Sequence, residues 1–296
     1  QSFTLGASGQ NVTLDSGADI AAVNGEGVGA RPALAANKLT LLSGAAVTMT
    51  AAQNNSFDST VTAAGTETIT LSDASSASGI AEVERYVLAA GAQSFTLGAS
   101  GQNVTLDSTG SSGSVAISTG TLTSVTGTLD DGTGNDTIAL TLATTGVDIS
   151  SANTTDVDSI ALASGVSATM TIAQHALITS AAGTNTVTLS NAGTVSGNAA
   201  VEGYVLAAAG NSAFTLGATG QNITTGSAGS DTIVVGTLTA TGTFNTVSGD
   251  TVSLDTGADI SAVNGEGVGA GSALAADKLT LVSGASVTMT AAQNNS

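Results

Sequence analysis

Aspartates that follow glycines, directly before an apolar segment, are the residues of this sequence best suited to chemistry. They occur in Asp131-Gly-Thr-Gly-Asn-Asp-Thr-Ile138 and in Gly226-Ser-Ala-Gly-Ser-Asp-Thr-Ile233, and a related segment runs from Asn245 to Val252. Glycines allow backbone carbonyls to turn toward an ion, and aspartate supplies the charge that a hard, oxygen-seeking cation requires. We therefore predict calcium ligands at Asp131, Asn135, Asp136, Ser230, Asp231 and Asp250.

The same segments also support a simpler interpretation. Calcium-binding rolls repeat the pattern G-G-x-G-x-D-x-U-x and share each ion between successive turns. Here each segment is a single unit, and one of the paired glycines is replaced. The alternative is a plain Asp/Gly turn that leads into a strand. Both interpretations stay open on the sequence alone.

Other acidic residues suggest turns rather than a reaction. Asp15 and Asp19, and likewise Asp255 and Asp259, pair two carboxylates within one short segment. Such a pair could act as an acid and a base, but we expect these residues to cap turns. Glu82, Glu84 and Glu202 are expected on a solvated strand face.

The single histidine does not indicate a catalytic or metal site. His175 has no cysteine partner anywhere in the chain, so it makes a poor transition-metal ligand set. No nucleophile motif surrounds it either. We expect His175 at the surface, we predict no catalytic residues, and we expect that the chain is not an enzyme.

These residues lie in a repetitive sequence. The phrase Phe95-Thr-Leu-Gly-Ala-Ser-Gly-Gln-Asn-Val-Thr105 occurs nearly unchanged at residues 3–13 and again at residues 214–224. Neighbouring phrases recur with a period of about 119 residues, which indicates a repeat protein. The predicted repeats are residues 1–93, 94–212 and 213–296, the first shortened and the third truncated, in one continuous elongated domain.

Short strands separated by glycine turns fill each repeat. Apolar residues alternate with Thr or Ser, as in Val47-Thr-Met-Thr50, which predicts half-buried strands. Glycine-rich segments between them predict turns. Thr171 to Leu177 and its relatives could form either a short helical turn or a corner. This pattern allows a parallel β-solenoid (β-helix) or tandem β-sandwich domains.

A length difference between repeats favours the solenoid. The third repeat places residues 225–253 between its phrase and Leu254, whereas the first repeat passes directly from Thr13 to Leu14. Such a loss would remove core strands from a sandwich, but it takes one whole coil from a solenoid and leaves the others stacked. We predict an all-β parallel solenoid with coils of about 20–27 residues and about five coils per repeat.

Composition narrows the classes of partner. The chain has 22 acidic and 4 basic residues, a net charge of −18, and only 2% aromatic residues. Lys and Arg dominate contacts with phosphates, so nucleic acid is close to excluded and anionic membranes are disfavoured. No apolar run is long enough for a membrane-spanning helix, so we expect no membrane insertion. Cysteine is absent, so the redox compartment is undetermined.

Both ends of the sequence lie inside a repeat. The chain begins at Gln1 without Met, and it ends at Ser296, where the first repeat continues into Phe57. We expect a window of a longer protein. Solenoid ends expose unpaired strand edges, so we also expect the window to continue covalently or to stack end to end.

Several phrases resemble the very large bacterial β-strand-repeat surface proteins, which are similar to RTX-like and S-layer-like exoproteins exported by type I secretion. These phrases are V-E-x-Y-V-L-A-A-G, F-T-L-G-A-x-G-Q-N-V-T, G-x-D-T-I and L-T-L-x-S-G-A-x-V-T-M-T-A-A-Q. The resemblance covers essentially the whole sequence. It implies calcium that rigidifies the repeats, carried over closely onto Asp136 and Asp231 and less closely onto Asp250.

The resemblance implies an extracellular, cell-surface location and a structural function. We expect a fibre, stalk or biofilm-matrix region that reaches outward and associates with itself, end to end or laterally. One alternative is a calcium-stabilised adhesin or S-layer binding module that contacts glycans or cell surfaces. Another is a β-helix enzyme acting on polysaccharides, but such sites need basic residues and aromatic platforms that this chain offers only sparsely.

Overall fold

Alternation of apolar and hydroxyl residues gives each strand one buried side. In the computed structural model, β5 (Thr68–Leu71) and β17 (Thr186–Leu189) bury their aliphatic residues and leave their threonines half-exposed. The strands pair in parallel with strands of the neighbouring coils, in register. The protein is therefore nearly all-β and forms a parallel β-solenoid, as the sequence predicts. The alternative of tandem β-sandwich domains is wrong.

The structure describes most of the chain in two compact units, residues 1–161 and 162–296. The described residues are 10–21, 36–57, 59–62, 65–89, 91, 93–107, 113–133, 135–265, 271, 273–275 and 278–295. Most of the phrase copy at residues 3–13 lies outside them. The division between the units falls within the second predicted repeat, and the repeat boundaries stay a prediction.

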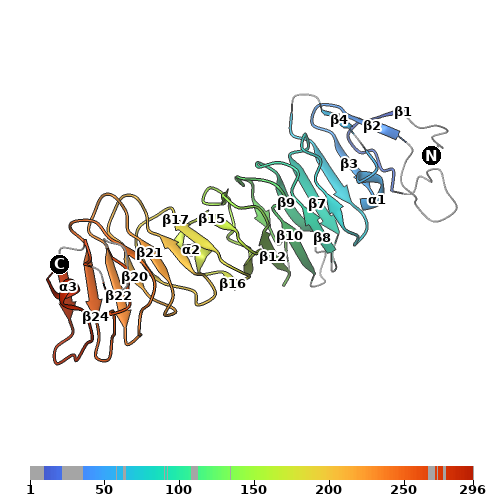
Figure 1. Ribbon diagram of the computed structural model, residues 1–296. Coiled ribbons are helices and arrows are strands. Elements are labelled where there is room, and N and C mark those ends of the chain that lie inside the picture. The colour runs from blue at the N-terminus through green and yellow to red at the C-terminus, as the bar shows by residue number, and fades with distance from the viewer. Residues whose placement is uncertain are drawn as a thin grey trace. The chain divides into compact units, whose positions relative to one another are not determined.

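In the first unit, strands β3, β5, β7, β9 and β11 are successive neighbours in one sheet, and β6, β8, β10 and β12 in another. A third sheet has the order β1-β2-β4. In Figure 1, β7 lies beside β9, and β8 lies beside β10. The elements are β1 (Gln10–Leu14), β2 (Ala36–Leu41), β3 (Ala46–Met49), α1 (Ala51–Asn54), β4 (Ser59–Thr62), β5, β6 (Ala77–Ser78), β7 (Arg85–Ala89), β8 (Gln93–Thr96), β9 (Asn103–Asp107), β10 (Ser114–Ser118), β11 (Leu129–Asp130), β12 (Thr137–Leu142) and β13 (Val147–Asp148).

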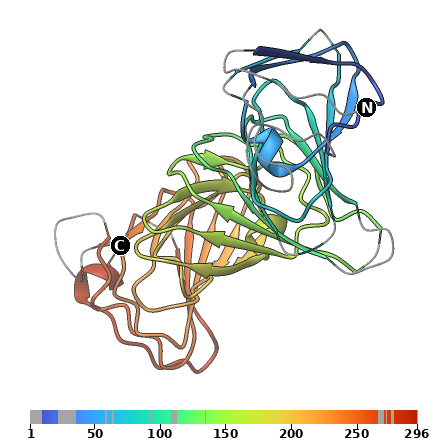
Figure 2. The ribbon, with the colours of Figure 1, turned by 90° about the vertical axis from the view of Figure 1, so that its right-hand side faces the viewer.

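In the second unit, one sheet has the successive neighbours β15, β17, β19, β21 and β23, and another has the order β18-β20-β22-β24-β25. The coils of this unit, orange and red in Figure 2, follow similar paths one behind another. The strand β14 (Ser159–Leu162) crosses the division between the units. The other elements are β15 (Ser167–Met170), α2 (Ile172–His175), β16 (Ile178–Ala181), β17, β18 (Thr194–Ser196), β19 (Gly203–Val205), β20 (Ala213–Thr215), β21 (Asn222–Thr224), β22 (Thr232–Gly236), β23 (Phe244–Asn245), β24 (Thr251–Leu254), β25 (Lys278–Leu281) and α3 (Ala291–Asn294).

Some coils are shorter than the roughly 20–27 residues that the sequence pattern predicts. Residues joined by a hydrogen bond across one coil lie 17 apart at Glu67 and Glu84, and 25 apart at Asn103 and Thr128. The lower limit of about 20 residues is therefore wrong. A short coil needs only tighter turns, because the strand register is preserved across it.

The short segment after each of the three methionines is helical. In α1, α2 and α3, a threonine side chain accepts a hydrogen bond from the backbone N–H of a glutamine three residues on, whose side chain accepts from the threonine backbone N–H. This reciprocal capping box stabilises even one turn of helix. Within the described ranges, no helix is both long and apolar enough to cross a membrane.

The recurring phrase has a structural function that explains its glutamine. Gln221 is buried, and its side-chain amide donates to the carbonyl oxygens of Asn198 and Val201 at 2.8 and 2.9 Å. Its Oε1 accepts from the backbone N–H of Gly217 at 2.7 Å. Gln102 makes the corresponding bonds in the preceding repeat. The glutamine thus ties its own turn to the coil before it.

The glycine of the phrase allows two backbones to touch. A Cβ atom on Gly217 would lie 1.9 Å from the carbonyl oxygen of Gly197 in the neighbouring coil. Gly220 belongs to the same phrase, yet a Cβ atom there meets nothing within 4 Å. The two glycines therefore differ in whether a neighbouring coil occupies the space beside them.

We predict that Gly217→Ala lowers the free energy of unfolding by about 2–3 kcal/mol, because the added methyl group forces the two coils apart. Gly220→Ala is the matched control and should change it by less than about 0.5 kcal/mol. Urea unfolding followed by circular dichroism measures both. Equal effects of the two substitutions would contradict the close approach of the coils.

Candidate functional site

Of the six predicted calcium ligands, Asp231 and Asp250 come together in the second unit. Both are buried, with 1% of each residue exposed. Asp231 accepts from the backbone N–H groups of Ser212 at 2.7 Å and Gly226 at 2.8 Å, one on each oxygen. Its own N–H donates to Oδ1 of Asp250 at 2.8 Å. The two carboxylates therefore connect three successive coils.

The other oxygen of Asp250 is also occupied by donors. Oδ2 accepts from the hydroxyl of Thr225 at 2.6 Å and from the N–H of Val247 at 2.9 Å. Every carboxylate oxygen of Asp231 and Asp250 thus has a donor from the protein itself. Ser230 lies at the exposed surface beside them, and its N–H donates to the side chain of Asn211 at 2.9 Å.

The three predicted ligands of the first unit are arranged differently. Asp136 is buried, and its Oδ1 accepts from the backbone N–H of Gly113 in the preceding coil. Its Oδ2 is buried without a hydrogen-bond partner among the described residues. Asn135 is exposed, and Asp131 is half-buried. The calcium assignment for these six residues stays a prediction.

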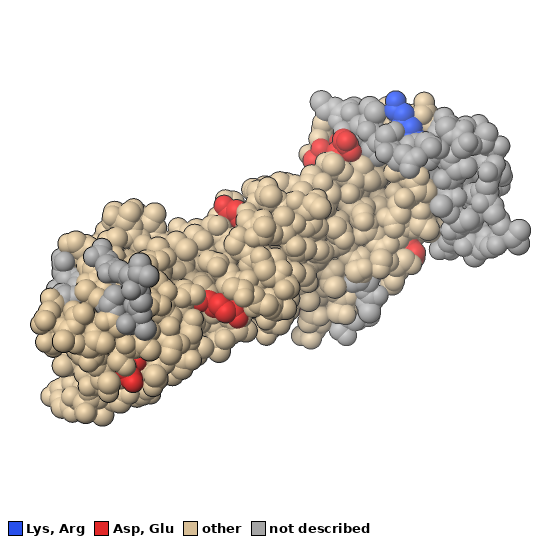
Figure 3. Space-filling view, in the orientation of Figure 1, with Lys and Arg blue, Asp and Glu red and all other residues tan. Residues whose placement is uncertain are grey.

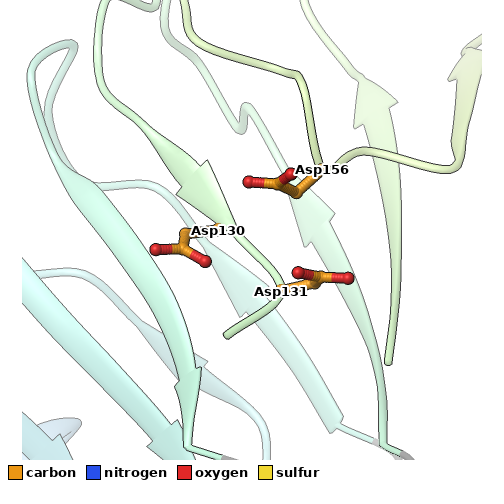
Figure 4. Close-up of side chains that lie close together, drawn as sticks. All are labelled: Asp130, Asp131 and Asp156. Carbon is orange, nitrogen blue, oxygen red and sulfur yellow. The ribbon is translucent and has the colours of Figure 1, made fainter. Parts of the chain in front are cut away.

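An acidic cluster forms around Asp131. Side-chain oxygens of Asp130, Asp131 and Asp156 lie within 4.8 Å of one another, and Figure 4 shows the three carboxyl groups grouped near the end of β11. Partial desolvation, followed by the negative charges of Asp156 and Asp130, raises the pKa of Asp131. Three oxygen ligands at this spacing could coordinate a divalent cation.

Sequence reasoning identified Asp131 but missed its two partners. Finding them requires the register between coils. Thr128 pairs with Asn153 in the next coil, so Asp131 and Asp156 occupy matching positions. Without that register, the two aspartates are distant in the chain and nothing joins them. Asp130 follows from its position directly before Asp131.

Two glutamates expected to be solvated instead connect coils. Oε2 of Glu84 accepts from the N–H of Glu67 at 2.9 Å, and Oε2 of Glu202 accepts from the N–H of Asn185 at 2.8 Å. Both glutamates are half-buried, so the expectation of a solvated face is wrong. They precede strands, as Asp231 and Asp250 do, and they accept from the coil before.

The proposed turn caps have the expected contacts. Oδ1 of Asp19 accepts from the N–H of Ala21 at 2.9 Å, and Oδ1 of Asp259 accepts from the N–H of Ser261 at 2.9 Å. Hydrogen bonds from the hydroxyl and then the backbone N–H of Ser261 lower the pKa of Asp259. Turn capping is thus confirmed for these two residues.

His175 is buried rather than exposed, so the expectation of a surface histidine is wrong. Its Nε2 lies 3.0 Å from the hydroxyl of Tyr204, and burial lowers the pKa of the imidazole. The Tyr204 oxygen accepts from the N–H of Asn198 at 2.7 Å, and its hydrogen has two acceptors in reach, the imidazole at 3.0 Å and the carbonyl oxygen of Asn198 at 3.5 Å. Burial also raises the pKa of Tyr204 to about 12, so it stays a donor.

These features place the protein in the class of parallel β-solenoids whose coils are joined by buried polar side chains. On the face shown in Figure 3, acidic side chains form separate small patches on a mostly uncharged surface. No protein-family model, curated protein or solved structure matches this chain.

We predict a histidine contribution to pH-dependent stability. Because the folded pKa of His175 is lowered, the unfolded chain binds the proton more tightly, and stability is lost as pH falls below about 6.5. The variant His175→Asn introduces the residue that repeat one carries as Asn54, which pairs with the hydroxyl of Tyr86.

Thermal unfolding between pH 7.5 and 5.5 measures the effect. The wild-type midpoint should fall more steeply over this range than that of His175→Asn. Parallel pH profiles for the two proteins would show that the buried imidazole does not couple protonation to folding.

Proposed function

We propose that this chain is a structural repeat region of an extracellular bacterial surface protein, acting as a fibre, stalk or matrix segment without catalytic activity. The observation that supports this proposal is that hydrogen bonds from side chains join successive coils. Side chains that precede strands, including Asp231, Asp250, Glu84 and Glu202, accept backbone hydrogen bonds from the preceding coil. Each coil thereby gains stability from its neighbour, as in other linear repeat proteins.

The distribution of polar groups supports a mechanical function over a chemical one. Buried polar side chains such as Gln102, Gln221 and Asp250 direct their atoms at groups of their own turn and of the adjacent coil. A catalytic group instead needs an atom directed at a substrate. These hydrogen bonds between coils should make the chain resist extension, because pulling one coil away breaks several of them together.

The cluster of Asp130, Asp131 and Asp156 favours a second candidate, a calcium-stabilised form of the same region. Close like charges destabilise the folded state, and a bound cation removes that cost. Oδ2 of Asp136, which is buried and has no hydrogen-bond partner in the described part of the chain, lies in the same aspartate-rich segment. In this candidate the proposed partners are calcium and other copies of the chain, with glycans or cell surfaces contacted by the assembled protein.

The location is tested with antibodies raised against the purified chain. Immunogold electron microscopy of intact producing cells should place the label outside the cell envelope, on filaments of uniform width. A regular two-dimensional lattice would favour an S-layer instead, and label confined to the cytoplasm would contradict the proposal.

Calcium dependence is tested on the purified chain with and without chelator. If the cluster binds calcium, millimolar calcium raises the thermal midpoint of the wild type, and Asp131→Asn abolishes most of that rise. Without calcium, Asp131→Asn should itself stabilise the chain by less than about 1 kcal/mol, because one like charge is removed from a solvent-screened group. The control is Asp255→Asn, which removes an aspartate outside the cluster. A calcium response retained in Asp131→Asn would exclude this cluster as the site.

A further inference from the structure

The helical turns α1 and α2 are each followed, in the next coil, by a strand that lies at the end of its sheet. The strand β6 ends its sheet in repeat one, and β18 ends its sheet in repeat two. In each repeat the preceding coil carries a short helix, α1 or α2, where another strand would otherwise pair. An end strand has a row of backbone N–H and C=O groups without a neighbouring strand to bond them. The two repeats differ in whether side chains bond these groups.

In repeat one, asparagine side chains satisfy the row. Asn55 donates from Nδ2 to the carbonyl of Ser76 and accepts at Oδ1 from the N–H of Ser78, both at 3.0 Å. Asn54 donates to the carbonyl of Ser78 at 2.7 Å. In a parallel ladder one residue donates and accepts in this way to residues i and i+2 of its neighbour. The Asn55 amide therefore takes the place of one residue of a parallel strand.

In repeat two, both asparagines are replaced. His175 stands at the position of Asn54 and is engaged with Tyr204, and Ala176 stands at the position of Asn55. The matching backbone groups are the carbonyl of Thr194 and the N–H and carbonyl of Ser196.

These three groups point away from the sheet. The N–H of Gly197 donates to Thr215 and that of Ala213 donates to Gly193, so the odd-numbered residues around β18 face β20. Residues 194 and 196 consequently direct their backbone groups to the other side. No hydrogen bond from another described residue reaches these groups.

A pocket lies on that side. It has a volume of about 410 Å³, and its wall combines apolar and polar groups. It opens beside the edge of β18, and Ala176, the counterpart of Asn55, contributes to its wall. Its lining includes Ile172, His175, Ala176, Ile178, Val195 and Asn198.

We propose that this edge and pocket form a binding site for an extended peptide segment of a partner protein, which adds to β18 as a parallel strand. One peptide residue donates its N–H to the carbonyl of Thr194 and accepts from the N–H of Ser196. The N–H two residues further on donates to the carbonyl of Ser196, and an aliphatic side chain enters the pocket between Ile172 and Val195. Addition of a strand to an exposed sheet edge is an established mode of peptide recognition.

Repeat one, in which asparagine side chains close the edge, indicates which chemical groups the open edge of repeat two can bind. In repeat one the occupant is a carboxamide, which presents the same donor and acceptor as a peptide group. The pocket contains no Lys, Arg, Asp or Glu side chain, so it selects an uncharged segment. A sugar acetamide offers one amide, whereas three backbone groups at strand spacing match a peptide.

The experiment uses the full 296-residue chain and a tetrapeptide, acetyl-Thr-Ile-Thr-Leu-amide, with the sequence of β5. Nuclear magnetic resonance measures amide hydrogen exchange at Ser196 and Ser78. Without peptide, Ser196 should exchange faster than Ser78. Saturating peptide should slow exchange at Ser196 by at least about tenfold, and leave Ser78 unchanged.

Two reciprocal substitutions make the test specific. Ala176→Asn restores the amide of repeat one, and it should slow exchange at Ser196 and abolish the peptide effect. Asn55→Ala opens the equivalent edge, and it should make Ser78 respond to peptide. Because backbone bonds carry the recognition, failure of the peptide to protect Ser196 overturns the proposal. Peptide protection that persists in Ala176→Asn, or protection by N-acetylglucosamine and not by peptide, also overturns it.

Discussion

The structure depends on hydrogen bonds that join backbone N–H groups of one coil to side chains of the next. Where strands pair, the ladder satisfies these groups; where the chain turns before a strand, it does not. Asp231, Asp250, Glu84 and Glu202 supply acceptors at those places. A buried N–H group without a partner costs free energy, so a side chain that accepts a hydrogen bond is favoured at these positions.

This constraint accounts for part of the acidic composition. An ionised carboxylate only accepts hydrogen bonds, and it has two oxygens, so one aspartate can serve two N–H donors at once. Asp231 does so with Ser212 and Gly226. Asn185 stands at the corresponding turn of another coil, where its Oδ1 accepts from the N–H of Val166. The aspartate-glycine segments are thus needed for coil stacking whether or not an ion is bound near them.

The sequence was sufficient for the fold class and for turn caps such as Asp19 and Asp259, because alternation, glycine turns and whole-coil length differences are local signals. It was insufficient where the answer depends on register. The cluster at Asp130, Asp131 and Asp156 requires knowing that residue 128 pairs with residue 153. The burial of His175 requires knowing that Tyr204 lies above it. Both contacts depend on coil length. Tight turns shorten one coil to 17 residues, and no clear sequence pattern indicates this.

Because the chain is repetitive, equivalent residues of its own repeats can be compared with one another. Where two repeats agree, as at Gln102 and Gln221, the shared residue has a shared structural function, namely the bond to the preceding coil. Where they differ while the surrounding backbone is kept, stacking does not require the difference. The change from Asn55 to Ala176 is of this second kind, because it removes two hydrogen bonds from an exposed edge and leaves the strand in place. An edge that one repeat closes and the next leaves open is therefore not dictated by the fold, and this difference is the basis of the proposed peptide site.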